Sequence, residues 1–335
     1  MIDLALSFTS ILTSVVVCNL LIMVLWLVLN SNQGIKYINI NFIMIFNILI
    51  MIRLFLPFEY SFTKNIAFKV VLPSNPLKEY YVDEILLLVW MTGFIFKSYQ
   101  IVVLYYRLYN NIKRLPYCCS MEPILDKIGI KKKRFVNFKI VKTSELMTPA
   151  IFGLFHPTII IPNNDYTQEE LYYIFCHETE HYYQRDLWIK VILEFLCALY
   201  WWNPFSKVFR ELVSKTIEMR IDSKIIGTMD ERQRLEYLSC LLKVAKSHKK
   251  SINNLTVAFN GKKANLKQRF YHVLNYQITQ KKRLIVVNSI LAGIIIFLSL
   301  AITLEPYYIK PKDFLDIPVY KLLEKNNEFK QHRTE

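Results

Sequence analysis

The sequence contains little glycine and no closely spaced cysteine pair of the metal-binding kind. Only 7 of its 335 residues are glycine, where an average protein has about 7%, so a glycine-rich phosphate-binding loop and a collagen-like segment are excluded. The six cysteines are scattered and form no Cys-x-x-Cys pair, which excludes a cysteine zinc ribbon. We expect reduced thiols and no disulfide framework.

Acidic residues are also scarce. The chain has 27 Asp and Glu against 42 Lys and Arg, so its formal net charge is +15. Hydrophobic residues make up 53% of the chain and the mean hydropathy is +0.24, which excludes an intrinsically disordered protein. A nucleic-acid-binding protein can be as basic, but it does not need long uncharged apolar runs. The composition favours a membrane protein with a large cationic cytoplasmic part.

Four apolar runs set the expected topology, because a transmembrane helix needs about 20 apolar residues. The first run has no charge and is too long for the core of a signal peptide, so we interpret it as a membrane span. Arg53 lies near one end of the second run, and Lys97 interrupts the third. The expected spans are residues 4–30, 37–57, 85–106 and 284–304.

The distribution of basic residues predicts the orientation of these spans. Of the 42 Lys and Arg, 30 lie between Arg107 and Arg283, and the positive-inside rule places that segment in the cytoplasm. We therefore expect a multi-pass protein of the cell membrane with both termini extracellular. The predicted organisation is three spans in 1–106 with an extracellular loop at 58–84, a cytoplasmic domain at 107–283, a fourth span at 284–304, and a short extracellular tail at 305–335.

The cytoplasmic segment has α+β character. Residues 138–141, 150–153 and 158–161 are rich in β-formers, and the last two runs predict a hairpin or two consecutive strands. Thr167 and Glu170 form a capping-box pattern that predicts a helix from about 171 to 183. Asn203 and Pro204 predict the start of another helix, which ends near 226. The apolar stretch 187–202 predicts either a core helix or a helix lying partly in the membrane.

The first of these helices contains a His-Glu-x-x-His motif. His177 and His181 are four residues apart, so both imidazoles lie on one helix face and can reach a single Zn²⁺. Glu178 lies beside them, where it can accept the proton of a water that zinc activates. The alternative is a surface helix that carries two unrelated histidines.

A catalytic zinc site needs a third protein ligand. The best candidate is Glu218, which shares a helix face with Asp222, and we expect Asp222 to hydrogen-bond the free N–H of a ligand histidine. Asp186, five residues after His181, suits a supporting position better than a metal-binding one. Cys176 points about 100° away from its neighbour His177. The other candidates for the third ligand, besides Glu218, are Asp186, Glu194 and Glu211.

The chain resembles the BlaR/MecR antirepressor family of membrane metallopeptidases in the order of several sequence blocks. The four-span layout, with the protease between spans three and four, is also similar. The blocks are 148–162, 177–181 with Arg185 and Asp186, 202–205, and 218–222.

The resemblance implies a mainly α membrane protein in which a gluzincin-like α+β zinc metallopeptidase domain stands between helices three and four. It implies that His177, His181 and Glu218 bind zinc and that Glu178 is the catalytic base. Family members that sense β-lactams carry a penicillin-binding domain after the fourth span. The 335 residues contain no such domain, so we expect no β-lactam sensing.

The expected function is a signal-transducing endopeptidase that cleaves a cytoplasmic protein, a transcriptional repressor. Whether it also cleaves itself or forms a homo-oligomer is open. We expect contact with membrane lipid and no direct contact with nucleic acid, because the basic run 131–134 lies near anionic lipid. The alternatives are a housekeeping membrane protease of the Ste24/HtpX kind and a non-enzymatic membrane transducer.

A substrate-binding role is predicted for Ile159, Ile160 and Ile161. Zinc peptidases must fix the scissile carbonyl near the metal, and an edge strand does so through main-chain hydrogen bonds. The proline-bounded β-runs before the zinc helix are the best candidates for such an edge.

Overall fold

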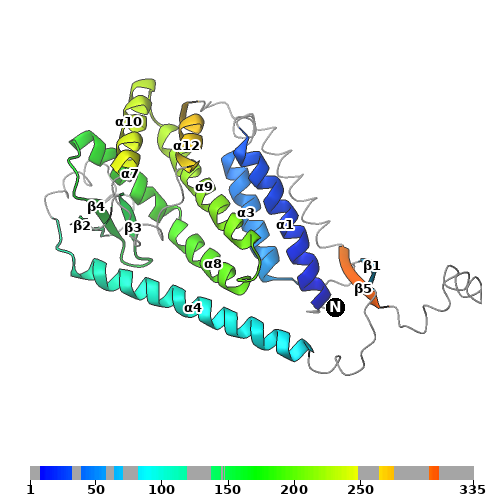
Figure 1. The fold of residues 1–335 in the computed structure, drawn as a ribbon. Coiled ribbons are helices and arrows are strands. Elements are labelled where there is room, and N and C mark those ends of the chain that lie inside the picture. Colours follow the sequence, from blue (N-terminus) through cyan, green and yellow to red (C-terminus); the bar gives the residue numbers. More distant parts are fainter. Residues whose placement is uncertain are drawn as a thin grey trace, which may run out of the picture.

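The computed structural model describes residues 8–31, 39–57, 64–70, 82–118, 137–144, 146, 148–247, 264–274 and 302–308. Within these ranges the chain is mainly helical, as the sequence predicts. The helices α1 and α3 lie side by side at one end, and a small sheet with α7 and α10 lies at the other (Figure 1). Helices α8 and α9 lie between these two ends, and the long helix α4 runs along one side (Figure 1).

Three of the expected spans are helices. They are α1 (Phe8–Asn30), α3 (Ile40–Phe55) and α4 (Val82–Arg114). Within the described residues, 10–30 and 84–114 are long and apolar enough to cross a membrane, whereas α3 is a shorter apolar helix of 16 residues. Helix α4 continues beyond Tyr106, the end of the predicted third span, to Arg114. It ends just before Leu115 and Pro116, and a residue that precedes proline disfavours the helical conformation.

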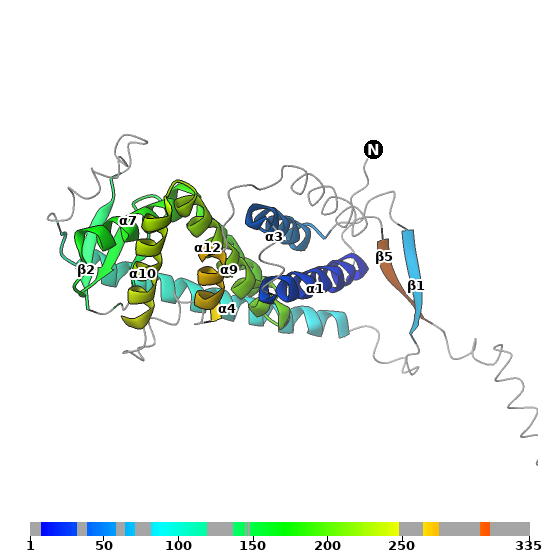
Figure 2. The ribbon, with the colours of Figure 1, turned by 90° about the horizontal axis from the view of Figure 1, so that it is seen from above.

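Two short strands meet beside the N-terminal end of α1. Strand β1 (Lys64–Val70) pairs in parallel with β5 (Ile302–Tyr308), and Figure 2 shows the two strands side by side. The predicted fourth span lies outside the described residues, except that residues 302–304 belong to β5 and not to a helix. The pairing joins two segments that the predicted topology assigns to one side of the membrane. The topology itself stays a prediction.

The second sheet contains β2 (Lys139–Thr143), β3 (Ala150–Phe152) and β4 (Thr158–Pro162) in the order β2-β4-β3. β4 pairs in parallel with β2 and antiparallel with β3, so the predicted hairpin is confirmed. The prediction that Ile159, Ile160 and Ile161 offer a free edge is wrong, because β4 is the central strand and all three side chains are fully buried. Within the described residues, β3 pairs only with β4 and is therefore an edge strand of this sheet.

The helix with the His-Glu-x-x-His motif, α7 (Gln168–Tyr183), begins as its capping box predicts. The Thr167 hydroxyl accepts a hydrogen bond from the Glu170 amide at 3.2 Å, and the Thr167 amide donates to the Glu170 carboxylate at 2.8 Å. Helices α8 (Asp186–Leu199) and α9 (Phe205–Ile226) follow. The Asn203 side chain accepts from the Phe205 amide at 3.0 Å, as a capping residue does, and α9 begins at Phe205, one residue after the predicted start at Pro204. The last helices are α10 (Glu231–Ser247) and α12 (Ala264–Leu274).

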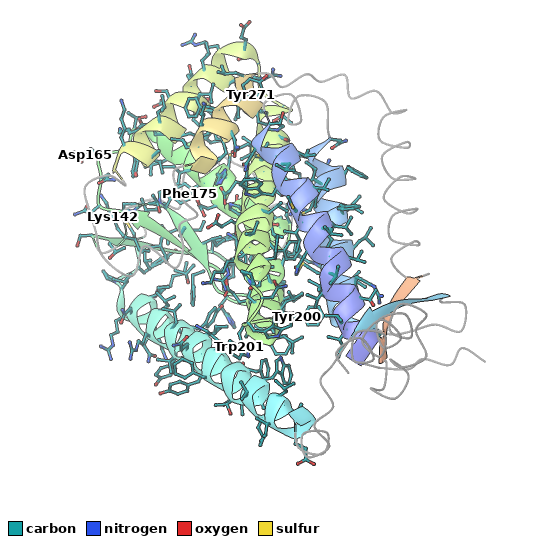
Figure 3. All side chains as sticks on the ribbon, turned by 45° about the vertical axis from the view of Figure 1, so that its right-hand side comes forward. Lys142, Asp165, Phe175, Tyr200, Trp201 and Tyr271 are labelled. Atoms are coloured by element: carbon teal, nitrogen blue, oxygen red, sulfur yellow. The ribbon has the colours of Figure 1, made fainter. Side chains whose placement is uncertain are left out.

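Helix α9 belongs to two hydrophobic cores. Its first half packs with α1, α3 and α8, and its last turns pack with the sheet, α7 and α10. The α8–α9 turn also contacts the neighbouring helices: the Tyr200 hydroxyl donates to the Leu54 carbonyl of α3, and the Trp201 indole donates to the Trp90 carbonyl of α4. Figure 3 shows Tyr200 and Trp201 at this turn. The turn between α8 and α9 therefore contacts both α4 and α3.

Helix α8 combines features of both interpretations of 187–202. Leu193 and Leu196 are buried in the core. On its other side Trp188, Ile192 and Phe195 are 40–48% exposed, although they are large and apolar. One face is therefore a core face, and the other is the kind of face that a helix lying partly in the membrane would present.

The turn between β3 and β4 depends on Gly153. Its φ of 100° is a conformation that side chains disfavour, and an added Cβ would lie 2.3 Å from the His156 carbonyl oxygen. We expect Gly153→Ala to destabilise the protein by about 1–3 kcal/mol, measured as a lower thermal midpoint in detergent. Gly227→Ala is the matched control, because Gly227 has a helical φ of −62°. Equal midpoints for the two variants would contradict the assignment of strain to this turn.

Candidate metal centre

Three side chains from two helices converge between α7 and α9. The Nε2 atoms of His177 and His181 lie 3.2 Å apart. The Glu218 carboxylate of α9 lies 3.3 Å from the first of these nitrogens and 3.6 Å from the second. Both histidines are buried, and Glu218 is partly buried. The structure therefore brings together the three residues that the sequence predicts as ligands.

Each histidine is held through its other ring nitrogen. The His181 Nδ1–H donates to Asp186 Oδ2 at 2.9 Å, which is the supporting position predicted for Asp186. The His177 Nδ1–H donates at 3.0 Å to the Tyr237 hydroxyl, which itself donates to Asp222 Oδ1 at 2.6 Å. Because both Nδ1 atoms carry their protons, both Nε2 lone pairs face the space between the rings.

The predicted direct bond from Asp222 to a ligand histidine needs a correction. Asp222 Oδ1 lies 3.7 Å from His177 Nδ1, and the Tyr237 hydroxyl stands between them. Asp222 thus supports His177 through a tyrosine. No spacing pattern in the sequence points to Tyr237, which comes from α10 and is only 1% exposed.

Two arginines compensate the buried carboxylates. Arg220 pairs with Asp186, which is fully buried. Arg269 from α12 pairs with Asp222 through two nitrogens and lies 3.0 Å from Glu218. No motif or spacing in the sequence marks either arginine. Their roles follow only from the chemistry, because a buried carboxylate requires a positively charged partner.

These charges keep Glu218 and Asp222 ionised. Burial by itself would raise the pKa of Glu218, but Arg269 and the two histidines outweigh it and hold the pKa well below its usual range. For Asp222, burial likewise opposes ionisation, and Arg269 lowers the pKa in spite of it. Both groups are therefore available as anionic oxygen donors at neutral pH.

The site fits a tetrahedral metal ion. An ion with bonds of about 2.0–2.1 Å to nitrogen and oxygen has ligands about 3.3 Å apart. The two imidazole nitrogens are 3.2 Å apart, Glu218 Oε2 lies 3.3 Å from His177 Nε2, and Glu218 Oε1 lies 3.6 Å from His181 Nε2. One donor atom from each of the three residues lies within 4.8 Å of the other two. Two neutral imidazoles and one carboxylate supply three ligands and leave a fourth position open. Within the described part of the chain, this is the group of residues whose donor atoms could hold a metal ion.

The other contenders for the third position have different roles. Glu194 forms an ion pair with Arg210 at 2.8 Å, and Glu211 is exposed on α9. Burial raises the pKa of the Cys176 thiol to about 11, so it is protonated at neutral pH and is a poor ligand. Glu178 follows His177 on α7 and is buried, with 8% of its surface exposed.

The chain is similar to known proteins of one family. Residues 8–273 match the profile of the family described as BlaR1 peptidase M56. Over 231 residues, or 63% of the chain, the sequence is 26% identical to the regulatory protein BlaR1 of Bacillus licheniformis, of which it covers 37%. It is also 22% identical over 214 residues to the regulatory protein BlaR1 of Staphylococcus aureus, of which it covers 36%. The chain thus spans a little over a third of the length of these relatives.

Removing one of the three converging side chains tests the site. We expect His181→Ala to reduce bound zinc from one equivalent per chain to none, because two ligands hold the ion far more weakly than three. Elemental analysis of the purified protein measures this. His156→Ala is the control, because this histidine is exposed on the β3–β4 turn. A full equivalent of zinc in Glu218→Ala would rule out Glu218 as the third ligand.

Proposed function

Since the chain belongs to the BlaR1 peptidase M56 family, we propose that it is an integral membrane zinc endopeptidase of signal transduction. The observation that carries the proposal is the convergence of two imidazole nitrogens and a carboxylate, together with Glu178, which directly follows His177 on α7. His177, His181 and Glu218 would hold the zinc, in a gluzincin-like arrangement. A non-enzymatic transducer would not need this complete set of side chains.

When bound, Zn²⁺ supplies Lewis acidity, which lowers the pKa of water to about 7 and polarises a carbonyl group. The protein supplies the rest of the chemistry. Glu178 accepts the proton of the attacking water and passes it to the leaving amine. Asp186 and Tyr237 keep His181 and His177 in the tautomer that leaves both Nε2 lone pairs free.

Strand β3 is the best candidate for holding the substrate backbone. It lies at the edge of its sheet and packs against α7. An extended peptide that pairs with β3 would lie alongside the helix that carries Glu178, with its carbonyls held by main-chain hydrogen bonds. Substrate binding thus moves from Ile159–Ile161 to Ala150, Ile151 and Phe152, one strand further out.

We propose a cytoplasmic protein as the substrate, specifically a transcriptional repressor, with self-cleavage as a second activity. The name "regulatory protein" carried by both relatives supports regulated cleavage over a housekeeping protease of the Ste24/HtpX kind. Four spans, contact with membrane lipid and an extracellular position of both termini belong to the same proposal. The two long apolar helices support its membrane location.

Glu178 separates metal binding from catalysis. We expect Glu178→Gln to retain one equivalent of zinc and to lose at least about 100-fold in kcat, because general-base catalysis contributes roughly that much. Cleavage of unfolded casein and self-cleavage provide the readouts. Glu180→Gln is the matched control two residues along the helix, where the carboxylate pairs with Lys224 and Gln184. Cleavage by Glu178→Gln at the wild-type rate would refute the assigned base.

The topology can be tested with introduced cysteines in a variant free of native cysteine. We expect Asp3→Cys and Gln331→Cys to react with an impermeant maleimide added to intact cells, because both positions are extracellular. Arg232→Cys on α10, where the native side chain is 89% exposed, should react only after permeabilisation. If Gln331→Cys also required permeabilisation, the number of spans would be odd.

A further inference from the structure

We propose that Arg269 of α12 is a positioning residue of the metal centre, which orients Glu218 directly and His177 indirectly. The inference rests on the proposed zinc peptidase function. Arg269 contacts both acidic groups of α9 at the site, and it comes from a different helix. Neither the sequence motif nor the family assignment points to it.

The contacts of Arg269 use the whole guanidinium group. Its Nε lies 2.7 Å from Asp222 Oδ2, and its Nη2 lies 2.8 Å from Asp222 Oδ1. Its Nη1 lies 3.0 Å from Glu218 Oε2. A planar guanidinium in this two-pronged arrangement fixes the plane of the Asp222 carboxylate as well as its distance.

The contact with Glu218 is made to one of its two oxygens. Arg269 Nη1 lies 3.0 Å from Oε2, which is also 3.3 Å from His177 Nε2, whereas Oε1 lies 3.6 Å from His181 Nε2. We therefore expect Arg269 to hold the Glu218 carboxylate in the orientation that keeps its two oxygens near the two histidine nitrogens. Such a supporting contact fixes the orientation of a ligand carboxylate.

The contact with Asp222 extends to His177. Oδ1 of Asp222 accepts from both Arg269 and the Tyr237 hydroxyl, and that hydroxyl accepts the Nδ1–H of His177. If Arg269 were removed, the fully buried Asp222 carboxylate would lose its cation. It would then have to rotate or take up a proton, and the chain of hydrogen bonds to His177 would change. Arg269 thus acts on two of the three expected ligands.

Helix α12 holds Arg269 in place through contacts on either side of it. Gln268 donates to the Asn30 side chain at the end of α1 at 3.2 Å. His272 lies 2.5 Å from the Ser223 hydroxyl of α9. Arg269 therefore enters the site from an element that is docked on both α1 and α9, as a positioning residue requires.

The test measures zinc affinity of the full-length protein in detergent by competition with a chelating dye. We expect Arg269→Gln to weaken zinc binding about 10–100-fold, the range typical for lost supporting contacts. Arg269→Lys should give an intermediate loss of zinc affinity, because lysine keeps the positive charge but cannot form the two parallel hydrogen bonds of a guanidinium group. Lys267→Gln is the matched control, since this exposed side chain lies two residues away on α12.

A purely structural ion pair would lower the thermal midpoint and leave zinc affinity unchanged below that temperature. That result would overturn the proposal. If Arg269→Gln does not fold, a wild-type zinc affinity in Arg269→Lys would overturn it as well. Because misplaced ligands also impair the reaction, kcat for casein should fall more than KM changes. If the wild-type protein itself bound no zinc, the proposed function would fail. If the wild-type protein and all variants bound zinc equally well, only the role of Arg269 would fail.

Discussion

The candidate metal centre depends on two imidazole nitrogens that lie 3.2 Å apart. Both can offer a lone pair to one metal ion only if each ring carries its proton on the opposite nitrogen and has an acceptor there. The acceptors are Asp186 for His181 and Tyr237, backed by Asp222, for His177. Because both aspartates are fully buried, each in turn requires an arginine. The site is therefore a set of dependent contacts that extends well beyond the motif.

The position of the site between two hydrophobic cores follows from helix α9. Its early turns pack against α1 and α3, where Lys215 donates to the Leu29 carbonyl at 2.7 Å and Thr216 accepts from Asn47 at 3.2 Å. Glu218 lies within a turn of both residues. The third expected ligand is thus fixed to the same stretch of helix that contacts the two N-terminal apolar helices, so the geometry of the site is tied to their packing.

In the small sheet, β3 is an edge strand and β4 is the central strand. β4 has neighbours on both sides, and its hydrogen-bonding groups are used within the sheet, whereas β3 lies at the edge of the sheet and contacts α7. The turn that joins them requires Gly153, one of only seven glycines in the chain. The scarcity of glycine elsewhere agrees with a fold made mostly of long helices, in which glycine is unfavourable.

The sequence by itself determined the features that follow from local patterns. The capping box at Thr167, the helical spacing of His177 and His181, the pairing of Glu218 with Asp222 on one face, and the apolar runs of α1, α3 and α4 all depend on neighbours within a few residues. Such periodicities and caps can be predicted from the sequence, because they depend only on the geometry of one helix and on residues within it. The same local logic placed Asp186 beside His181, five residues further along.

Only the tertiary structure decided which strand is central, where α4 ends relative to the domain that follows it, and which residues from distant elements complete the site. Tyr237 and Arg269 lie on α10 and α12, 60 residues or more from His177 in the sequence. No local pattern marks them, because their roles arise from the need to satisfy buried charges that the fold creates. The sequence determined which helix carries the metal-binding side chains, and the packing of the helices determined what holds those side chains in place.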